Sequence, residues 1–328
     1  MKFETKKTTS LGLQKRMQRH SQKGFTLIEL LISMTITLVI VGLLMGMTKM
    51  AVGAWQTTHA KSRSSRLAQE VFDTIGKDLE GIVIRTGNKY EWLLIQESNN
   101  SGVDNGVASK EMVNPLEISF FSAVTDRYNG QINHPTEDRG GDISMIRYRL
   151  IQKDLIGAAK EKPVFALYRQ RIEPKEAFDD FLAKESIDED SNEINGYDTD
   201  QIVEDKNYLA ENIYDFTLSF IFEYTLNNKK GYKRVVVQTN GDVKGLRIKG
   251  NVIEIKDGAS WKPLNEEIPT GASQARLSGA DISILVLSDS AMNKLANDKT
   301  PSFSEDELAK FLLKNGHHYS KSVILPQP

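Results

Sequence analysis

The chain has 328 residues, a formal net charge of −2 and 39% hydrophobic residues, enough for one domain with large insertions or for two lobes. It contains no cysteine, which excludes disulfides and thiolate metal sites.

The N-terminus joins a basic segment to an apolar one. Met1–Gly24 holds seven basic residues and one acidic residue. Leu30–Thr48 follows without a charge, and its 19 residues would form a helix of about 28 Å, enough to span a hydrocarbon core. Positive charge before such a span predicts a cytoplasmic N-terminus and a translocated C-terminal body. Without Met1–Gly24 the chain would carry about −8, which argues against nucleic-acid binding as its main role.

Glu29 is the unusual residue of this region, because it lies a few positions inside an otherwise membrane-compatible helix. A carboxylate there is costly in lipid and is therefore a functional candidate. An ordinary secretory signal would have a shorter apolar region and then a small-residue cleavage site, which Ala51-Val52-Gly53-Ala54 could mimic. That alternative would release a soluble protein, and it leaves Glu29 unexplained.

The run Lys23-Gly24-Phe25-Thr26-Leu27-Ile28-Glu29 resembles the cleavage and methylation site of type IV prepilins and type II secretion pseudopilins. The resemblance implies that prepilin peptidase cleaves between Gly24 and Phe25, that Phe25 is N-methylated, and that the apolar helix stays in the mature protein. Glu29 becomes the fifth mature residue, where the family carries a glutamate that pairs with the N-terminal amine of a neighbouring subunit. Since a buried charge without its partner is strongly unfavourable, we expect Glu29 to be an assembly residue. The alternative is a carboxylate tolerated near the membrane interface.

The helix is predicted to continue beyond the apolar run, from about Thr26 to Leu79. Its second half has an apolar stripe at nearly every fourth position, formed by Leu67, Val71, Phe72, Ile75 and Leu79. Gly42 and Gly46 form a GxxxG pair, which can let helices approach closely, can loosen the helix locally, or can be ordinary membrane-helix residues.

The pattern changes from helix to strands after Gly81. Short apolar or alternating runs predict strands at Ile82–Arg85, Trp92–Gln96, Leu116–Phe121, Ile143–Leu150, Val164–Ile172, Phe216–Tyr224, Tyr232–Gln238 and Ile282–Leu287. Asn227–Gly231 predicts the turn of a hairpin. A helix followed by antiparallel strands predicts an α+β fold, here a pilin-like one with the long N-terminal helix packed on an antiparallel head with large loop insertions.

Three short landmarks in the head add a second resemblance. Ile146-Arg147-Tyr148-Arg149-Leu150, Ala166-Leu167-Tyr168-Arg169 and Leu209–Phe216 follow one another as in J-type minor pseudopilins and the related W-type minor pilins. The long insertions Gly87–Pro115 and Pro174–Asp205 are unlike a compact member of those families.

The acidic stretch near 174–205 contains a candidate calcium site. Its oxygen ligands would be Asp188, Asp190, Asn192, Asp198 and Asp200. However, the glycine and the closing glutamate of an EF-hand loop are absent, since Glu193 and Thr199 occupy those positions. A solvated flexible insertion is the alternative, given the charge and the few apolar residues.

No catalytic motif emerges, and we expect the chain not to be an enzyme. Gly-x-Ser-x-Gly, Walker and His-Glu-x-x-His patterns are absent, and His59, His134, His317 and His318 read as surface residues. Trp55, just past the apolar run, suits an interfacial anchor.

Together these features predict a leader at 1–24, a transmembrane and spine helix at 25–80, and a periplasmic β-rich head at 81–328. The expected function is structural: a minor pseudopilin of a type II secretion system at or near the filament tip, anchored once in the inner membrane before assembly. The expected partners are other pseudopilins or pilins, prepilin peptidase and the inner-membrane assembly platform, and no cofactor is expected apart from the candidate calcium. A minor pilin of a type IV pilus is the first alternative, and a membrane-tethered binding protein that never polymerises is the second.

Overall fold

The computed structural model describes residues 25–97, 116–123, 142–153, 164–182, 184–187, 201–238, 241–258, 260–296 and 304–326. The chain divides into an N-terminal unit, residues 1–56, and a head unit, residues 57–328. Gly24 and all five candidate calcium ligands, Asp188, Asp190, Asn192, Asp198 and Asp200, lie outside the described residues.

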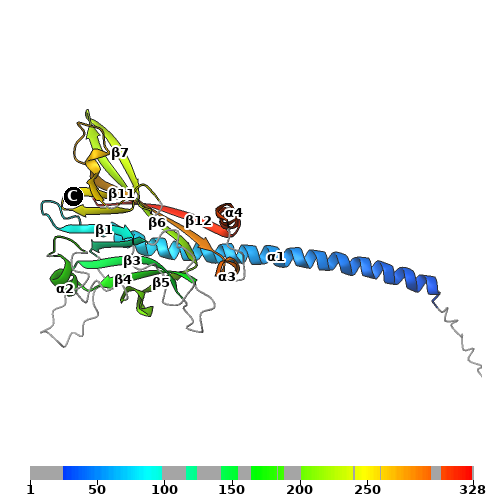
Figure 1. Cartoon of the computed structure of the whole chain (residues 1–328). Coiled ribbons are helices and arrows are strands. Elements are labelled where there is room, and N and C mark those ends of the chain that lie inside the picture. The colour runs from blue at the N-terminus through cyan, green and yellow to red at the C-terminus, as the bar shows by residue number, and fades with distance from the viewer. Residues whose placement is uncertain are drawn as a thin grey trace, which may run out of the picture. The chain divides into compact units, whose positions relative to one another are not determined.

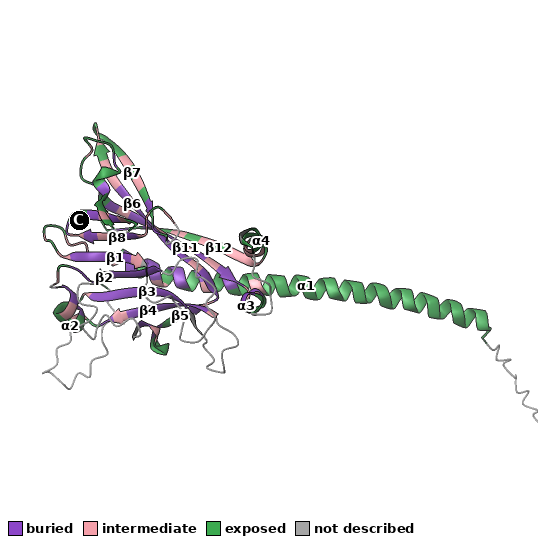
Figure 2. Ribbon diagram, viewed as in Figure 1, coloured by how far each residue is buried: buried purple, intermediate pink, exposed green. Residues whose placement is uncertain are grey.

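One helix, α1 (Leu27–Glu80), serves both units, and its two parts differ in burial. Every residue of the N-terminal unit that is described, from Phe25 to Gln56, is exposed, whereas the part in the head unit is amphipathic (Figure 2). Its buried residues are Ser64, Ala68, Val71, Phe72, Ile75, Gly76, Asp78 and Leu79. The predicted extent of the helix and the predicted apolar stripe are confirmed, with Leu67 partly buried at the edge of the stripe.

The head contains two antiparallel sheets (Figure 1). Sheet A has eight strands in the order β10-β9-β8-β1-β2-β3-β4-β5. In chain order they are β1 (Glu91–Glu97), β2 (Leu116–Ser122), β3 (Ser144–Lys153), β4 (Val164–Ile172), β5 (Tyr208–Glu211), β8 (Gly245–Lys249), β9 (Val252–Asp257) and β10 (Ser260–Pro263).

Sheet B has four strands in the order β12-β11-β6-β7. They are β6 (Ile213–Leu226), β7 (Lys229–Val236), β11 (Arg276–Leu287) and β12 (Gly316–Ile324). Two helices, α3 (Asp289–Ala296) and α4 (Glu305–Asn315), connect β11 to β12. Ser304 and Glu307 form a capping box that fixes the start of α4, because each side chain bonds the other residue's backbone N–H.

A single large core joins the head-side part of α1 to both sheets. It includes Val71 and Ile75 of α1, Phe120 of sheet A, and Phe216 and Ile282 of sheet B. The prediction of an α+β fold, with a long N-terminal helix packed on antiparallel sheets, is therefore confirmed.

Most predicted strands exist, but two predictions were wrong in detail. Ile82–Arg85 is not a strand, because only Ile82 forms a bridge, to Ser122, before the chain turns. The hairpin turn is shorter than predicted, since Asn227 and Asn228 alone form it and Lys229–Gly231 belong to β7.

Both ends of the acidic insertion are folded. After β4 the chain forms α2 (Pro174–Glu176) and the single-turn η1 (Ala177–Leu182), and two further short turns, η2 (Gln201–Val203) and η3 (Asp205–Asn207), precede β5. Phe181, Leu182, Ile187 and Ile202 are buried. These few apolar side chains pack both ends of the segment against the head. This packing was not predicted from the sequence, because the many charged residues of the segment were weighed more heavily than its few apolar ones.

Candidate functional site

The first turn of α1 holds Glu29 in a capping box with Thr26. The Glu29 carboxylate accepts hydrogen bonds from the Thr26 backbone N–H at 2.9 Å and from the Thr26 hydroxyl at 3.0 Å. In return the Glu29 backbone N–H donates to the Thr26 hydroxyl oxygen at 3.4 Å. The sequence Thr26-Leu27-Ile28-Glu29 has the spacing that this reciprocal cap requires. The sequence predicts that the Glu29 carboxylate pairs with the N-terminal amine of a neighbouring subunit. In the single chain this carboxylate bonds Thr26 instead.

The other predicted residues of this region surround that cap. Phe25 directly precedes Thr26, and it is 89% exposed. Thr26 is the residue that sequence reasoning missed, although its distance of three positions from Glu29 was a readable signal. The structure thus places Phe25, Thr26 and Glu29 together at the first turn of an exposed apolar helix.

Residues 25–56 present a largely apolar surface whose hydroxyl groups are bonded within the helix. Ser33, Thr35, Thr37 and Thr48 each donate their hydroxyl to a backbone carbonyl three or four residues earlier, at 2.7 to 2.9 Å. Within the described part of the chain, α1 is the one helix long and apolar enough to cross a membrane. Such a surface suits lipid or other apolar helices, since backbone and hydroxyl groups need no water.

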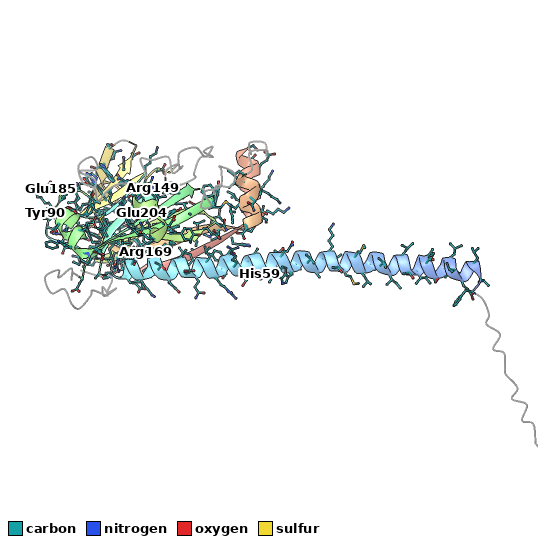
Figure 3. All side chains as sticks on the ribbon, turned by 90° about the horizontal axis from the view of Figure 1, so that it is seen from below. His59, Tyr90, Arg149, Arg169, Glu185 and Glu204 are labelled. Atoms are coloured by element: carbon teal, nitrogen blue, oxygen red, sulfur yellow. The ribbon has the colours of Figure 1, made fainter. Side chains whose placement is uncertain are left out.

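In the head unit, a buried ionic cluster fastens α1 to sheet A. Asp78 of α1 is 2% exposed. Arg169 of β4 donates to both oxygens of Asp78, from Nε at 2.6 Å and Nη2 at 2.8 Å, and the Tyr148 hydroxyl donates to the same carboxylate. A bidentate arginine–carboxylate pair is among the strongest polar contacts available to a protein. Figure 3 labels Arg169 beside α1.

The surroundings shift the pKa values of two groups in this cluster, the Arg169 guanidinium and the Tyr148 hydroxyl. Burial alone would lower the pKa of the Arg169 guanidinium, but its hydrogen bonds and charge interactions with Asp78 and Tyr148 together outweigh burial and raise that pKa. Burial, followed by the charge of Asp78, raises the pKa of the Tyr148 hydroxyl well above its ordinary value. The cluster therefore keeps a charged guanidinium and a neutral phenol at any ordinary pH.

The register of β3 and β4 explains the two Tyr-Arg landmarks. Tyr148 pairs with Arg169, and Arg149 pairs with Tyr168, because the strands run antiparallel. Side chains alternate between faces, so the first pair meets α1 and the second lies on the opposite face. On that opposite face Arg147 also lies buried, and its guanidinium binds Glu117 and Gln170. Asp78 lies beside the apolar stripe in the sequence, and its burial was not predicted.

Three ion pairs between described residues also attach α1 to the head. Arg63 of α1 bonds Glu211 of β5 at 2.7 Å and Asp289 of α3 at 2.5 Å. Lys321 of β12 bonds Asp73 of α1 at 3.1 Å. These pairs are partly exposed, and exposed ion pairs contribute about 1 kcal/mol or less. The buried Asp78 cluster is therefore the principal polar attachment of the helix.

A serine–histidine contact lies on the outer face of sheet B. The Ser283 hydroxyl and the His318 Nε2 are 2.7 Å apart. Asp215 and His318 both pair with Leu285, one from each side, so they stand about two strand spacings, or about 10 Å, apart. A catalytic triad needs the carboxylate hydrogen-bonded to the histidine. Here the Asp215 carboxylate instead accepts a hydrogen bond from the Thr217 hydroxyl, at 3.4 Å.

Asp215 gives a pH-dependent prediction. Burial is the main cause that raises the pKa of its carboxyl. Since the folded-state pKa exceeds the unfolded one, the folded protein loses stability as the pH rises through the folded pKa. Asp215→Asn should therefore raise the melting temperature of the detergent-solubilised chain near neutral pH, with no difference below the ordinary pKa of 3.8.

Asp257→Asn is the matched control for Asp215. In the wild type the hydrogen bond with Lys262 is the main cause that lowers the pKa of this exposed carboxyl. Asp257→Asn should therefore be slightly less stable than wild type near neutral pH, and this difference should disappear in acid. Thermal unfolding followed by circular dichroism across this pH range measures both variants. Equal pH profiles for wild type and Asp215→Asn would contradict the account of Asp215.

A cavity of about 410 Å³ lies within the head. Trp92, Ile248, Ile253 and Leu277 give it an apolar lining, and its polar lining residues are neutral or, at Arg276, cationic. It therefore offers no carboxylate–histidine pair of the kind used in acid–base chemistry.

Metal binding in the acidic insertion stays a prediction. Within the described ranges no three histidine or acidic side chains are grouped so as to hold a metal ion.

Comparison with known proteins bears on the N-terminal region. Residues 19–45 match the family model described as "Prokaryotic N-terminal methylation motif". Comparison with curated proteins gave no match. Among solved structures the chain is similar to the type IV-like pilin TTHA1219 from Thermus thermophilus, at 9% sequence identity and a TM-score of 0.29, over 80% of this chain and 96% of that one. The chain therefore has a type IV pilin-like N-terminus with a methylation motif, which implies processing by prepilin peptidase.

Proposed function

We propose that this chain is a structural subunit of a pilin-like filament, and specifically a minor pseudopilin of a type II secretion system. The observation that carries the proposal is the match of residues 19–45 to the N-terminal methylation motif, which runs into the apolar part of α1, where every residue from Phe25 to Gln56 is exposed. A helix of this composition needs lipid or apolar partners along its whole surface.

In the proposed mechanism, prepilin peptidase cleaves between Gly24 and Phe25, and Phe25 is methylated. The mature helix waits in the inner membrane as a single pass, with the head in the periplasm. During assembly it leaves the lipid for a bundle of like helices, and Glu29 exchanges its hydrogen bonds with Thr26 for the N-terminal amine of a neighbouring subunit. A carboxylate in an apolar surrounding needs such a partner.

The size of the head supports a place at or near the filament tip. Eight- and four-stranded sheets make a bulky body, and its described parts already contain four short helical segments before β5. A body of this size stacks less easily along a filament than a compact one. We therefore propose a tip or initiating role, with other pseudopilins and the inner-membrane assembly platform as partners.

A clean deletion tests the choice between filament types. We expect loss of a set of exported proteins from the culture supernatant, with surface pili unchanged in number. Loss of pili with exported proteins unchanged would reassign the chain to a type IV pilus as a minor pilin. No change in either would support a membrane-tethered protein that does not polymerise.

A further inference from the structure

Strand β7 forms one of the two edges of sheet B, at the end of the strand order β12-β11-β6-β7. A two-residue turn joins it to β6, and Asn227 and Asn228 have φ values of 50° and 61°, as a type I′ turn requires. Figure 1 shows β7 at the margin of the sheet. Within the described part of the chain, β6 is the one strand that pairs with β7.

The hairpin geometry identifies the backbone groups on that edge. Residues flanking a two-residue turn form a hydrogen-bonded pair, and such pairs then alternate along the ladder. Lys229 is paired with Leu226, so every second residue from Lys229 bonds β6. The backbone N–H and C=O groups of the alternate residues point outward, and these residues are Lys230, Tyr232, Arg234 and Val236.

This edge has few of the features that protect a sheet against strand addition. Proteins use short edges, prolines, bulges or charged residues for that purpose. β7 has eight residues, a regular register, no proline and no bulge. Tyr232 is 59% exposed and Val236 is 37% exposed, and both belong to the outward set. Charge is the one protective feature present, and charge repels only strands of the same sign.

That charge selects the partner. β7 contains four cations, Lys229, Lys230, Lys233 and Arg234, and no acidic residue. A second copy of β7 would bring four more cations to the same edge, which disfavours pairing between identical edges. Lys230 and Arg234 flank Tyr232 on one face, and their ion pairs with Glu223 and Asp281 are exposed enough to exchange.

We propose that β7 binds an extended acidic strand of another protein, which adds to this edge of sheet B. Acidic side chains opposite Lys230 and Arg234, with an apolar one opposite Tyr232, complement the edge. The backbone ladder supplies affinity and the alternate side chains supply specificity. This interaction does not depend on the proposed secretion role.

The first test measures binding of a fluorescent peptide of about eight residues to the full chain in detergent by fluorescence anisotropy. Every second residue of the peptide is in turn glutamate, valine, glutamate and valine, with threonine between them, so that one face can set acids opposite Lys230 and Arg234 and valine opposite Tyr232. Tyr232→Pro should weaken binding by about tenfold or more, because it removes one outward N–H and places a ring against the incoming strand. The fold should persist, since that N–H does not bond β6. Tyr232→Ala, which keeps the backbone donor, should bind within about threefold of wild type.

Two control peptides complete the test, and the melting temperature of Tyr232→Pro shows whether that variant is folded. A peptide of equal charge with a central proline should bind at least about tenfold more weakly, and one with lysine for glutamate should not bind. Equal binding of the proline peptide would show attraction by charge alone and overturn the proposal. Three other results would also overturn the proposal: failure of the glutamate peptide to bind, equal binding of the lysine peptide, or wild-type binding by a folded Tyr232→Pro variant.

Discussion

Glu29→Ala should abolish incorporation into filaments while leaving the protein in the membrane. If Glu29 is the counter-charge of a neighbouring N-terminal amine, its removal leaves a buried cation unpaired, at a cost of about 3–5 kcal/mol. Such a cost corresponds to a fall of about 100-fold or more in incorporation at equilibrium. Cross-linking of the mature protein to the other filament subunits, in cells, measures this fall.

Glu29→Gln separates the two roles of this side chain. The structure shows Glu29 in a capping box with Thr26, and glutamine also serves in capping boxes. If the charge is needed for assembly, Glu29→Gln should fail as Glu29→Ala does. If capping is the whole role, it should assemble normally. Thr37→Ala is the matched control, since it removes only a bond to the Ser33 carbonyl within the same helix.

Arg169→Met should strongly destabilise the head. It leaves the Asp78 carboxylate buried with the Tyr148 hydroxyl as its remaining donor of the three contacts described. Removing one partner of a buried pair costs about 3–5 kcal/mol. Thermal or denaturant unfolding of the detergent-solubilised chain, followed by circular dichroism, measures this loss.

Two further variants identify the cause of that loss. Lys262→Met breaks an exposed pair with Asp257 and should change stability by about 1 kcal/mol or less. Asp78→Leu combined with Arg169→Met removes both charges and should recover much of the loss. An Arg169→Met variant as stable as wild type would show that the Asp78 cluster does not stabilise the attachment of α1.

Periodic patterns made the helix and most strands predictable. The stripe at Val71, Ile75 and Leu79 is buried as its four-residue spacing implies. β2, β4 and β6 are apolar or alternate strongly, so their positions were evident. β8, β9 and β10 were missed because they are short and polar on one face. Their stability comes from pairing with β1 and with one another.

The Asp78 cluster could not be predicted, because it depends on register. Tyr148 and Arg169 meet only through the pairing of β3 with β4, and Asp78 reaches them only once α1 lies across those strands. Sequence spacing gives the face of each side chain but not its partner on another strand. The Glu29–Thr26 contact is local by contrast, so its spacing was visible in the sequence.

The position of the mature N-terminus tests the central claim most directly. Mass spectrometry of a C-terminally tagged protein, purified from membrane and filament fractions, would identify it. We predict a methylated Phe25 in both fractions, with the apolar helix retained. An N-terminus at Trp55, following cleavage after Ala54, would mean that the helix is a discarded signal peptide and would contradict the account.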